Sequence, residues 1–185
     1  MIMHLCILIA IMTPNRDSRT IVISDLHVSS GPLDDFDSEL ESNFISFLKQ
    51  LVNGGAVDLV INGDFLDFVQ APPWKGRELE SNSTSGIPLC FTEDQSKRKL
   101  QAIYSAHGAI FNAIGELLAS DSRNRLVILP GNHDADFFWS SIRADCSEMI
   151  KAGAKCSEEQ IQFHLESSFR PENNSGIWIE HGHQC

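Results

Sequence analysis

The chain has 185 residues, of which 42% are hydrophobic and 21% charged, an ordinary balance for one folded domain with a sizeable core. Its formal net charge of −11 argues against a nucleic-acid groove, because phosphate backbones are bound by clustered Lys and Arg. An anionic substrate would therefore have to be attracted by other positive charge, and bound metal ions could supply it. The oligomeric state cannot be inferred from these totals.

The cysteines and the N-terminus bear on the compartment of the protein and on whether it spans a membrane. The five cysteines are scattered without CxxC spacing: Cys6, Cys90, Cys146, Cys156 and Cys185. Neither a zinc knuckle nor a disulfide framework follows from this pattern, which favours a reducing, cytoplasmic location. The apolar run "MIMHLCILIAIM" is shorter than the ~20 residues that cross a bilayer and lacks the features of a secretory signal. We expect residues 1–19 to be a poorly ordered extension, with no membrane span.

The hydrophobic pattern predicts alternating strands and helices. "TIVISDLHVSS" (20–30) opens as a strand, and a helix follows from Phe36 to Leu51, with Ser38 and Glu41 as its capping box. The remaining expected elements are a strand at 57–62, a long loop at 70–92 containing Trp74, a helix at 93–120, and strands at 125–129, 160–166 and 176–182. This order predicts a parallel sheet covered by helices, with a ligand beyond the carboxyl ends of the strands.

Polar side chains follow each of the first three expected strands. Asp25 and His27 end the first, Asp64 and Asp67 the second, and Asn132 to Asp134 the third. Since the carboxyl ends of parallel strands meet at one edge of a sheet, three separate segments deliver Asp, His and Asn to one place.

These residue types can bind metal ions and phosphate. Asp25 and His27 lie two apart, so in an extended segment both would point to one side and share an ion. Asp64 has two carboxylate oxygens and could bridge two ions, which in such sites lie ~3.5–4 Å apart. Asn132 offers a neutral oxygen, while His133 could contact phosphate or protonate a leaving oxygen. Asp67 could hold His133 in one tautomer.

The motifs "DLH", "GDFLD", "GNHD" and "HGH" resemble, in order, the signature of the calcineurin-like metallophosphoesterases. The resemblance covers residues 20–183 and implies one domain over 20–185 with a β-sandwich flanked by helices, in four layers α/β/β/α.

The resemblance also implies a site of two divalent ions, Mn, Fe or Zn, of which we favour Mn. Asp25, His27 and Asp64 would hold the first ion, and Asp64, Asn132 and His181 the second. His133 and Asp67 would act in catalysis, and a bridging hydroxide would attack a phosphomonoester or phosphodiester.

The end of the chain departs from the family pattern. Members carry a further "GHxH" motif, whereas this chain stops at Cys185 directly after "EHGHQC". We therefore expect an incomplete site with three protein ligands per ion, and activity becomes the open question. His183, two residues after His181, is an alternative ligand.

Other functions fit less well but stay open. The second motif lacks the Arg-Gly typical of Ser/Thr protein phosphatases, and His133 stands where hydrolases of UDP-diacylglucosamine carry Arg. The alternatives are a non-catalytic scaffold with this fold, and a nucleotide phosphodiesterase or nuclease. We expect His107, which lies on the apolar face of the second helix, to belong to the core or to contact a strand end.

Overall fold

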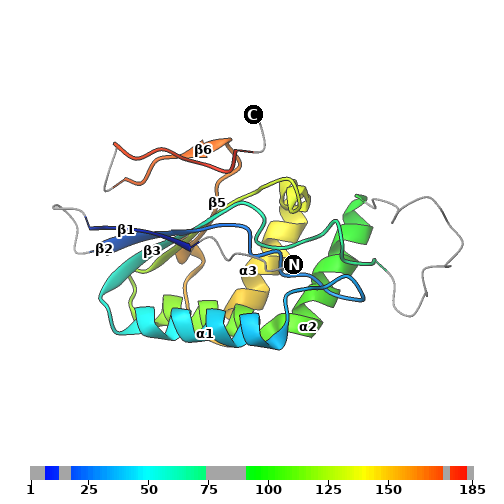
Figure 1. Ribbon diagram of the computed structural model, residues 1–185, viewed down its shortest axis with the longest axis horizontal. Helices are drawn as coiled ribbons and strands as arrows, with labels where there is room; N and C mark the ends of the chain where they lie inside the picture. Colours follow the sequence, from blue (N-terminus) through cyan, green and yellow to red (C-terminus); the bar gives the residue numbers. More distant parts are fainter. Residues whose placement is uncertain (1–6, 13–17, 74–90, 173–175, 183–185) are drawn as a thin grey trace, which may run out of the picture.

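The structure, a computed structural model, describes residues 7–12, 18–73, 91–172 and 176–182. Several sequence features lie outside the described residues: most of the long loop with Trp74, the alternative ligand His183, and Cys6, Cys90 and Cys185. Three helices cover one face of a five-stranded sheet, and a two-stranded sheet lies over the other face (Figure 1).

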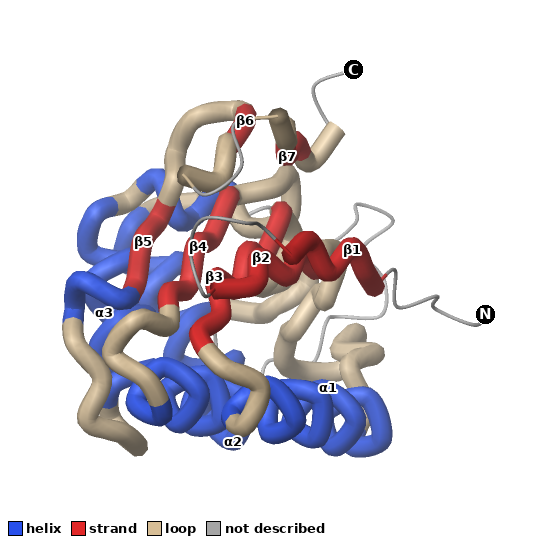
Figure 2. The backbone as a smooth tube through the Cα atoms, turned by 90° about the vertical axis from the view of Figure 1, so that its left-hand side faces the viewer, coloured by secondary structure: helices blue, strands red, loops and turns tan. Residues whose placement is uncertain are grey.

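The main sheet has the strand order β1-β2-β3-β4-β5 (Figure 2). Four strands are parallel: β2 (Ser18–Ile23), β3 (Ala56–Asn62), β4 (Arg125–Leu129) and β5 (Ile161–Phe163). At the edge, β1 (Ile7–Met12) pairs antiparallel with β2. Part of the expected N-terminal extension is thus a strand, while the position of the domain boundary stays a prediction.

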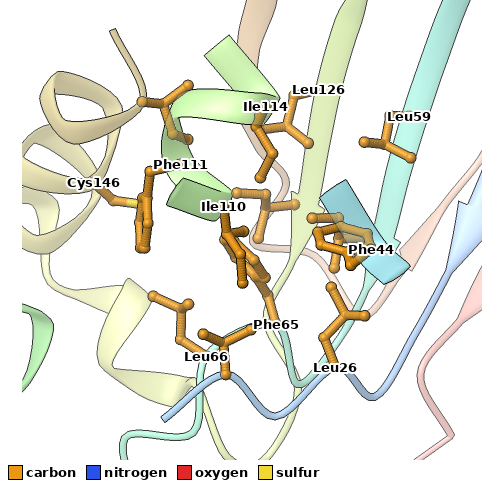
Figure 3. Packing of buried hydrophobic residues seen from close by; sticks show 14 of the residues in the cluster. Leu26, Phe44, Leu59, Phe65, Leu66, Ile110, Phe111, Ile114, Leu126 and Cys146 are labelled. Atoms are coloured by element: carbon orange, nitrogen blue, oxygen red, sulfur yellow. The ribbon is translucent and has the colours of Figure 1, made fainter. Parts of the chain in front are cut away.

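The helical layer consists of α1 (Ser38–Val52), α2 (Glu93–Ser120) and α3 (Ser140–Lys151), with short 3₁₀ turns η1 (Ala135–Phe138) and η2 (Glu158–Gln160). Alternate residues of each central strand, such as Leu59 and Ile61, face these helices in the larger hydrophobic cluster. Figure 3 shows the centre of this cluster, where Phe65 and Phe111 pack between sheet and helices.

The opposite face of the sheet carries a smaller cluster of Val60, Val127, Leu129 and Ile179. Ile179 belongs to β7 (Ile179–Glu180), which pairs antiparallel with β6 (Ser168–Phe169). The predicted α/β fold with two packed sheets is confirmed. No helix covers the outer side of β6 and β7 among the residues that the structure describes.

The structure corrects several expected boundaries. The N-cap of α1 is Asp37, whose Oδ1 accepts hydrogen bonds from the backbone N–H groups of Glu39 and Leu40, both at 2.9 Å, so the predicted Ser38–Glu41 box is wrong. The first strand ends at Ile23, and the last two expected strands shrink to 161–163 and 179–180. Among the described helices, none is long and apolar enough to cross a membrane.

Candidate metal centre

The turns after β2 and β3 place three candidate ligands in left-handed backbone conformations. Asp25, His27 and Asp64 have φ angles of 57°, 51° and 52°. The expectation that Asp25 and His27 lie in an extended segment is therefore wrong. The two turns hold each other, because Asp25 N–H donates to Gly63 O at 3.2 Å and His27 N–H donates to Asp64 O at 2.9 Å.

Two glycines, Gly63 and Gly131, make room for the side chains of Asp64 and His181. A Cβ atom on Gly63 would lie 2.1 Å from His181 Nδ1, and Gly63 also has a φ of +79°. A Cβ atom on Gly131 would lie 2.2 Å from Asp64 Oδ1 and 2.8 Å from His181 Nε2. Any other residue at either position would displace a candidate ligand.

Asp64 lies at the centre of the site. Its Oδ2 is 3.6 Å from His27 Nε2 and 3.3 Å from His181 Nε2, and the Asp64 side chain is almost fully buried. Two groups of three residues each bring one ligand atom within 4.8 Å of the others: Asp25, Asp64 and His181, and His27, Asp64 and His133. Asp64 is common to both groups, as the bridging role predicted for it requires.

The donor set fits divalent metal ions. Carboxylate oxygens and imidazole nitrogens are the ligands that Mn, Fe and Zn share in proteins. The buried Asp64 carboxylate faces two imidazoles, with Oδ2 3.6 Å from His27 Nε2 and 3.3 Å from His181 Nε2, and Gly63 and Gly131 allow the backbone to approach these side chains closely.

The grouping differs from the expected ligand sets. His133 joins His27 and Asp64, whereas the sequence analysis gave His133 a catalytic role and put Asp25 in that group. Asn132 is exposed at the turn after β4. Which side chains share an ion therefore stays a prediction.

The buried carboxylate of Asp67 contacts two imidazole rings of the site, those of His27 and His133. Its buried Oδ2 lies 3.2 Å from His27 Nδ1 and 2.9 Å from His133 Nδ1, and the two rings meet edge to face at 4.6 Å. The predicted contact between Asp67 and His133 is present, while the contact to His27 was missed. Both contacts leave the Nε2 atoms as the available ligand atoms.

The charges around Asp67 change the pKa values of both partners. The hydrogen bond to Asp67 raises the pKa of His27, and the Asp64 and Asp25 carboxylates add to this effect. Burial raises the pKa of Asp67, but the hydrogen bonds from His27, the Gln70 N–H and His133 outweigh burial and leave the pKa lowered.

Asp134 is a buried residue with a structural role that the sequence did not indicate. Its carboxylate accepts hydrogen bonds from the Phe65 N–H at 2.8 Å and the Gly131 N–H at 2.5 Å. Burial, reinforced by the Asp64 charge, raises its pKa to about 7. Asp134 therefore joins the "GNHD" turn to the "GDFLD" turn, which explains the last letter of the third motif.

His181 reaches the site from the second sheet. Its Nδ1 lies 2.9 Å from the backbone oxygen of Asn62, which turns Nε2 towards Asp64. The Asn62 side chain in turn donates to Glu180 O at 3.1 Å. Asn62, the last residue of β3, thus fixes the orientation of the His181 ring.

One comparison with known proteins identifies a family for the chain. A family model described as calcineurin-like phosphoesterase matches residues 18–184. No curated protein and no solved structure matches the chain.

Proposed function

The chain belongs to the calcineurin-like phosphoesterase family, and from this premise we propose that it hydrolyses small phosphorylated molecules at a centre of two divalent ions. Metal-dependent hydrolysis of phosphoesters is the activity of that family. The observation that carries the proposal is the sharing of the buried Asp64 by two groups of three ligands.

Each residue has a distinct role in the proposed site. Asp25, His27, Asp64, Asn132 and His181 would hold the ions, which would supply positive charge for the phosphoryl oxygens and a water acidic enough to attack phosphorus. His133 would contact the phosphoryl group or give a proton to the leaving oxygen. Asp67 would keep His27 and His133 in the tautomer that carries the proton on Nδ1.

The substrate class follows from charge and chemistry. The net charge of −11 supports a small phosphomonoester or phosphodiester in preference to a long nucleic acid. The mixed carboxylate and imidazole set supports Mn²⁺ as the first ion to test. Free Cys146 and Cys156 support the cytoplasm as the proposed compartment.

The test is the Asp64→Asn variant, with Asp35→Asn as a matched control because Asp35 is an exposed carboxylate in the segment before α1. We would count bound Mn²⁺ per chain and measure hydrolysis of a nitrophenyl monoester and diester. We expect two ions and turnover in the parent protein and in the control, and loss of both in Asp64→Asn, because the shared charge is removed. Near-normal turnover in Asp64→Asn would contradict the two-ion site.

A further inference from the structure

His107 lies between two carboxylates that come from different parts of the chain. Its Nε2 lies 2.8 Å from Asp34 Oδ2, and its Nδ1 contacts Glu41 Oε2. The His107 residue is only 7% exposed. Both ring nitrogens therefore face acceptors, and neither acceptor belongs to the two candidate ligand groups.

This geometry fixes the charge of the ring. A neutral imidazole has one N–H group, so one of its two nitrogens would direct a lone pair at a carboxylate. The doubly protonated ring donates to both. Burial lowers the pKa of His107, but the hydrogen bonds and charges of Asp34 and Glu41 outweigh it and leave the pKa raised. Among the described residues the ring also contacts uncharged Phe36, at 5.6 Å between centroids.

The three residues join three segments. His107 lies at a kink in α2, where its φ and ψ of −125° and 32° are not helical. Glu41 belongs to the first turn of α1, and Asp34 to the segment between β2 and α1. The imidazolium therefore ties α1 and this connecting segment to the middle of α2.

The connecting segment also supports Asp67. Val28 O accepts from Asp67 N–H at 2.8 Å, and Ser29 Oγ donates to Asp67 O at 3.1 Å. A Cβ atom on Gly31 would lie 3.0 Å from Pro72, so the segment packs closely against the chain that follows Asp67. One end of the segment thus carries His27 and touches Asp67, while the other end is held by His107.

We propose that His107 is a positioning residue that, as an imidazolium, holds the connecting segment 24–37 in place against Asp67. The orientation of His27 and His133 then depends on a charged group outside the site. The inference deepens the proposed function, since it concerns the ligands of the same site.

The first experiment measures the charge directly in metal-free protein. Nitrogen NMR of ¹⁵N-histidine protein at about pH 8 should show both ring nitrogens of His107 protonated, a condition that an unperturbed His no longer meets at that pH. With Asp34→Asn, the new amide can donate to a bare ring nitrogen, so His107 should become neutral while the fold persists. A neutral His107 in the parent protein would overturn the proposal.

The second experiment tests positioning with a pair of variants at one site. Asp34→Ala removes the contact, and we expect the ring signals of His27 and His133 to move. Asp34→Asn, in which the ring should be neutral, should move them as well, because the segment is then no longer held by an imidazolium. Asp35→Asn removes an exposed charge nearby and should leave those signals in place. His107→Gln should behave like Asp34→Ala. Unchanged signals in Asp34→Ala would make His107 a structural residue only and overturn the proposal.

Metal affinity gives an independent readout. Asp34→Ala should raise the dissociation constant for Mn²⁺ by about tenfold, the lower end of the effect of partners outside the ligand shell. An unchanged constant would contradict positioning. If the parent protein binds no Mn²⁺, the proposed function fails, while the ring signals of metal-free protein still decide the role of His107.

Discussion

Asp67 contacts two imidazole rings through a single oxygen atom. Since Oδ2 lies 3.2 Å from His27 Nδ1 and 2.9 Å from His133 Nδ1, a shift of this carboxylate moves a proposed ligand and a proposed catalytic group together. The two roles assigned to His27 and His133 are therefore coupled through one buried residue, and they can be separated only by changing one ring at a time.

His133→Ala separates them. We expect hydrolysis to slow by about 10²–10⁴-fold, the usual contribution of a positioned acid or base, while both ions stay bound. Turnover and bound Mn²⁺ per chain would be measured together, with His164→Ala as the control because His164 contacts Ser168 O at 2.7 Å in the outer sheet. Loss of one ion from His133→Ala would instead make His133 a ligand, as its grouping with His27 and Asp64 allows.

Residue patterns predicted which side chains gather but not how they do so. The positions of Asp25, His27 and Asp64 at strand ends could be read from the sequence, because parallel strands end at one edge. The left-handed φ values could not, since they arise from hydrogen bonds between two turns that are nearly 40 residues apart. The role of Asp134 depends equally on a distant group, the N–H of Phe65, which donates to it together with the nearby N–H of Gly131.

At the scale of elements, periodicity worked best where a segment is long. The predicted helix at 93–120 matches α2 in full, and the strand at 125–129 matches β4. The predicted N-cap of α1 was wrong because Asp and Ser are both good N-cap residues, and the sequence offers one of each at positions 37 and 38. The structure begins the helix at Ser38, with Asp37 as its N-cap. Alternation over 176–182 gave too long a strand, since β7 keeps only two paired residues.

β7 is the element that carries His181 to the site, and Ile179 anchors it. Ile179 is 6% exposed and packs with Val60, Val127 and Leu129. Ile179→Ala should lower the free energy of unfolding by about 2 kcal/mol, at the low end for buried aliphatic truncations. It should also weaken Mn²⁺ binding, because His181 lies two residues further on.

Urea unfolding and Mn²⁺ titration would measure these two effects. Val52→Ala is the control, because Val52 is 36% exposed at the end of α1 and its truncation should change neither quantity by much. Destabilisation of Ile179→Ala without any change in Mn²⁺ affinity would show that β7 does not position His181.

At the scale of the whole molecule, the order of strands and helices was enough to predict the parallel sheet and its helical cover. The antiparallel β1 at the sheet edge was not predicted, because its apolar run has no polar alternation to mark it as a strand. The polar partners of His107 were also missed, since Asp34 and Glu41 are 73 and 66 residues away in sequence.

The charge of His107 predicts how global stability depends on pH. Its pKa in the folded protein is raised above the ordinary 6.5, so its stabilising contribution is complete below about pH 6.5 and is lost as pH rises through the raised pKa. The free energy of unfolding of the parent protein should therefore fall across this range by more than that of His107→Gln.

Urea unfolding of metal-free protein at several pH values would test this dependence. The difference between the two proteins reports the contribution of His107 together with any change that its loss causes at His27, whose pKa is raised as well. Parallel stability curves for the two proteins would show that His107 does not change its protonation on unfolding.

The left-handed backbone at Asp25, His27 and Asp64 has a consequence for attempts to make this protein more stable. Left-handed φ values cost a residue with a Cβ atom about 1–2 kcal/mol, and glycine would adopt them without that cost. Among the described residues, each non-glycine position with this strain carries a proposed metal ligand, so the metal-free chain gives up stability that glycine would restore. Selecting variants for thermal stability alone would favour replacing these residues first, and the stabilised proteins would have lost the groups on which the proposed chemistry depends.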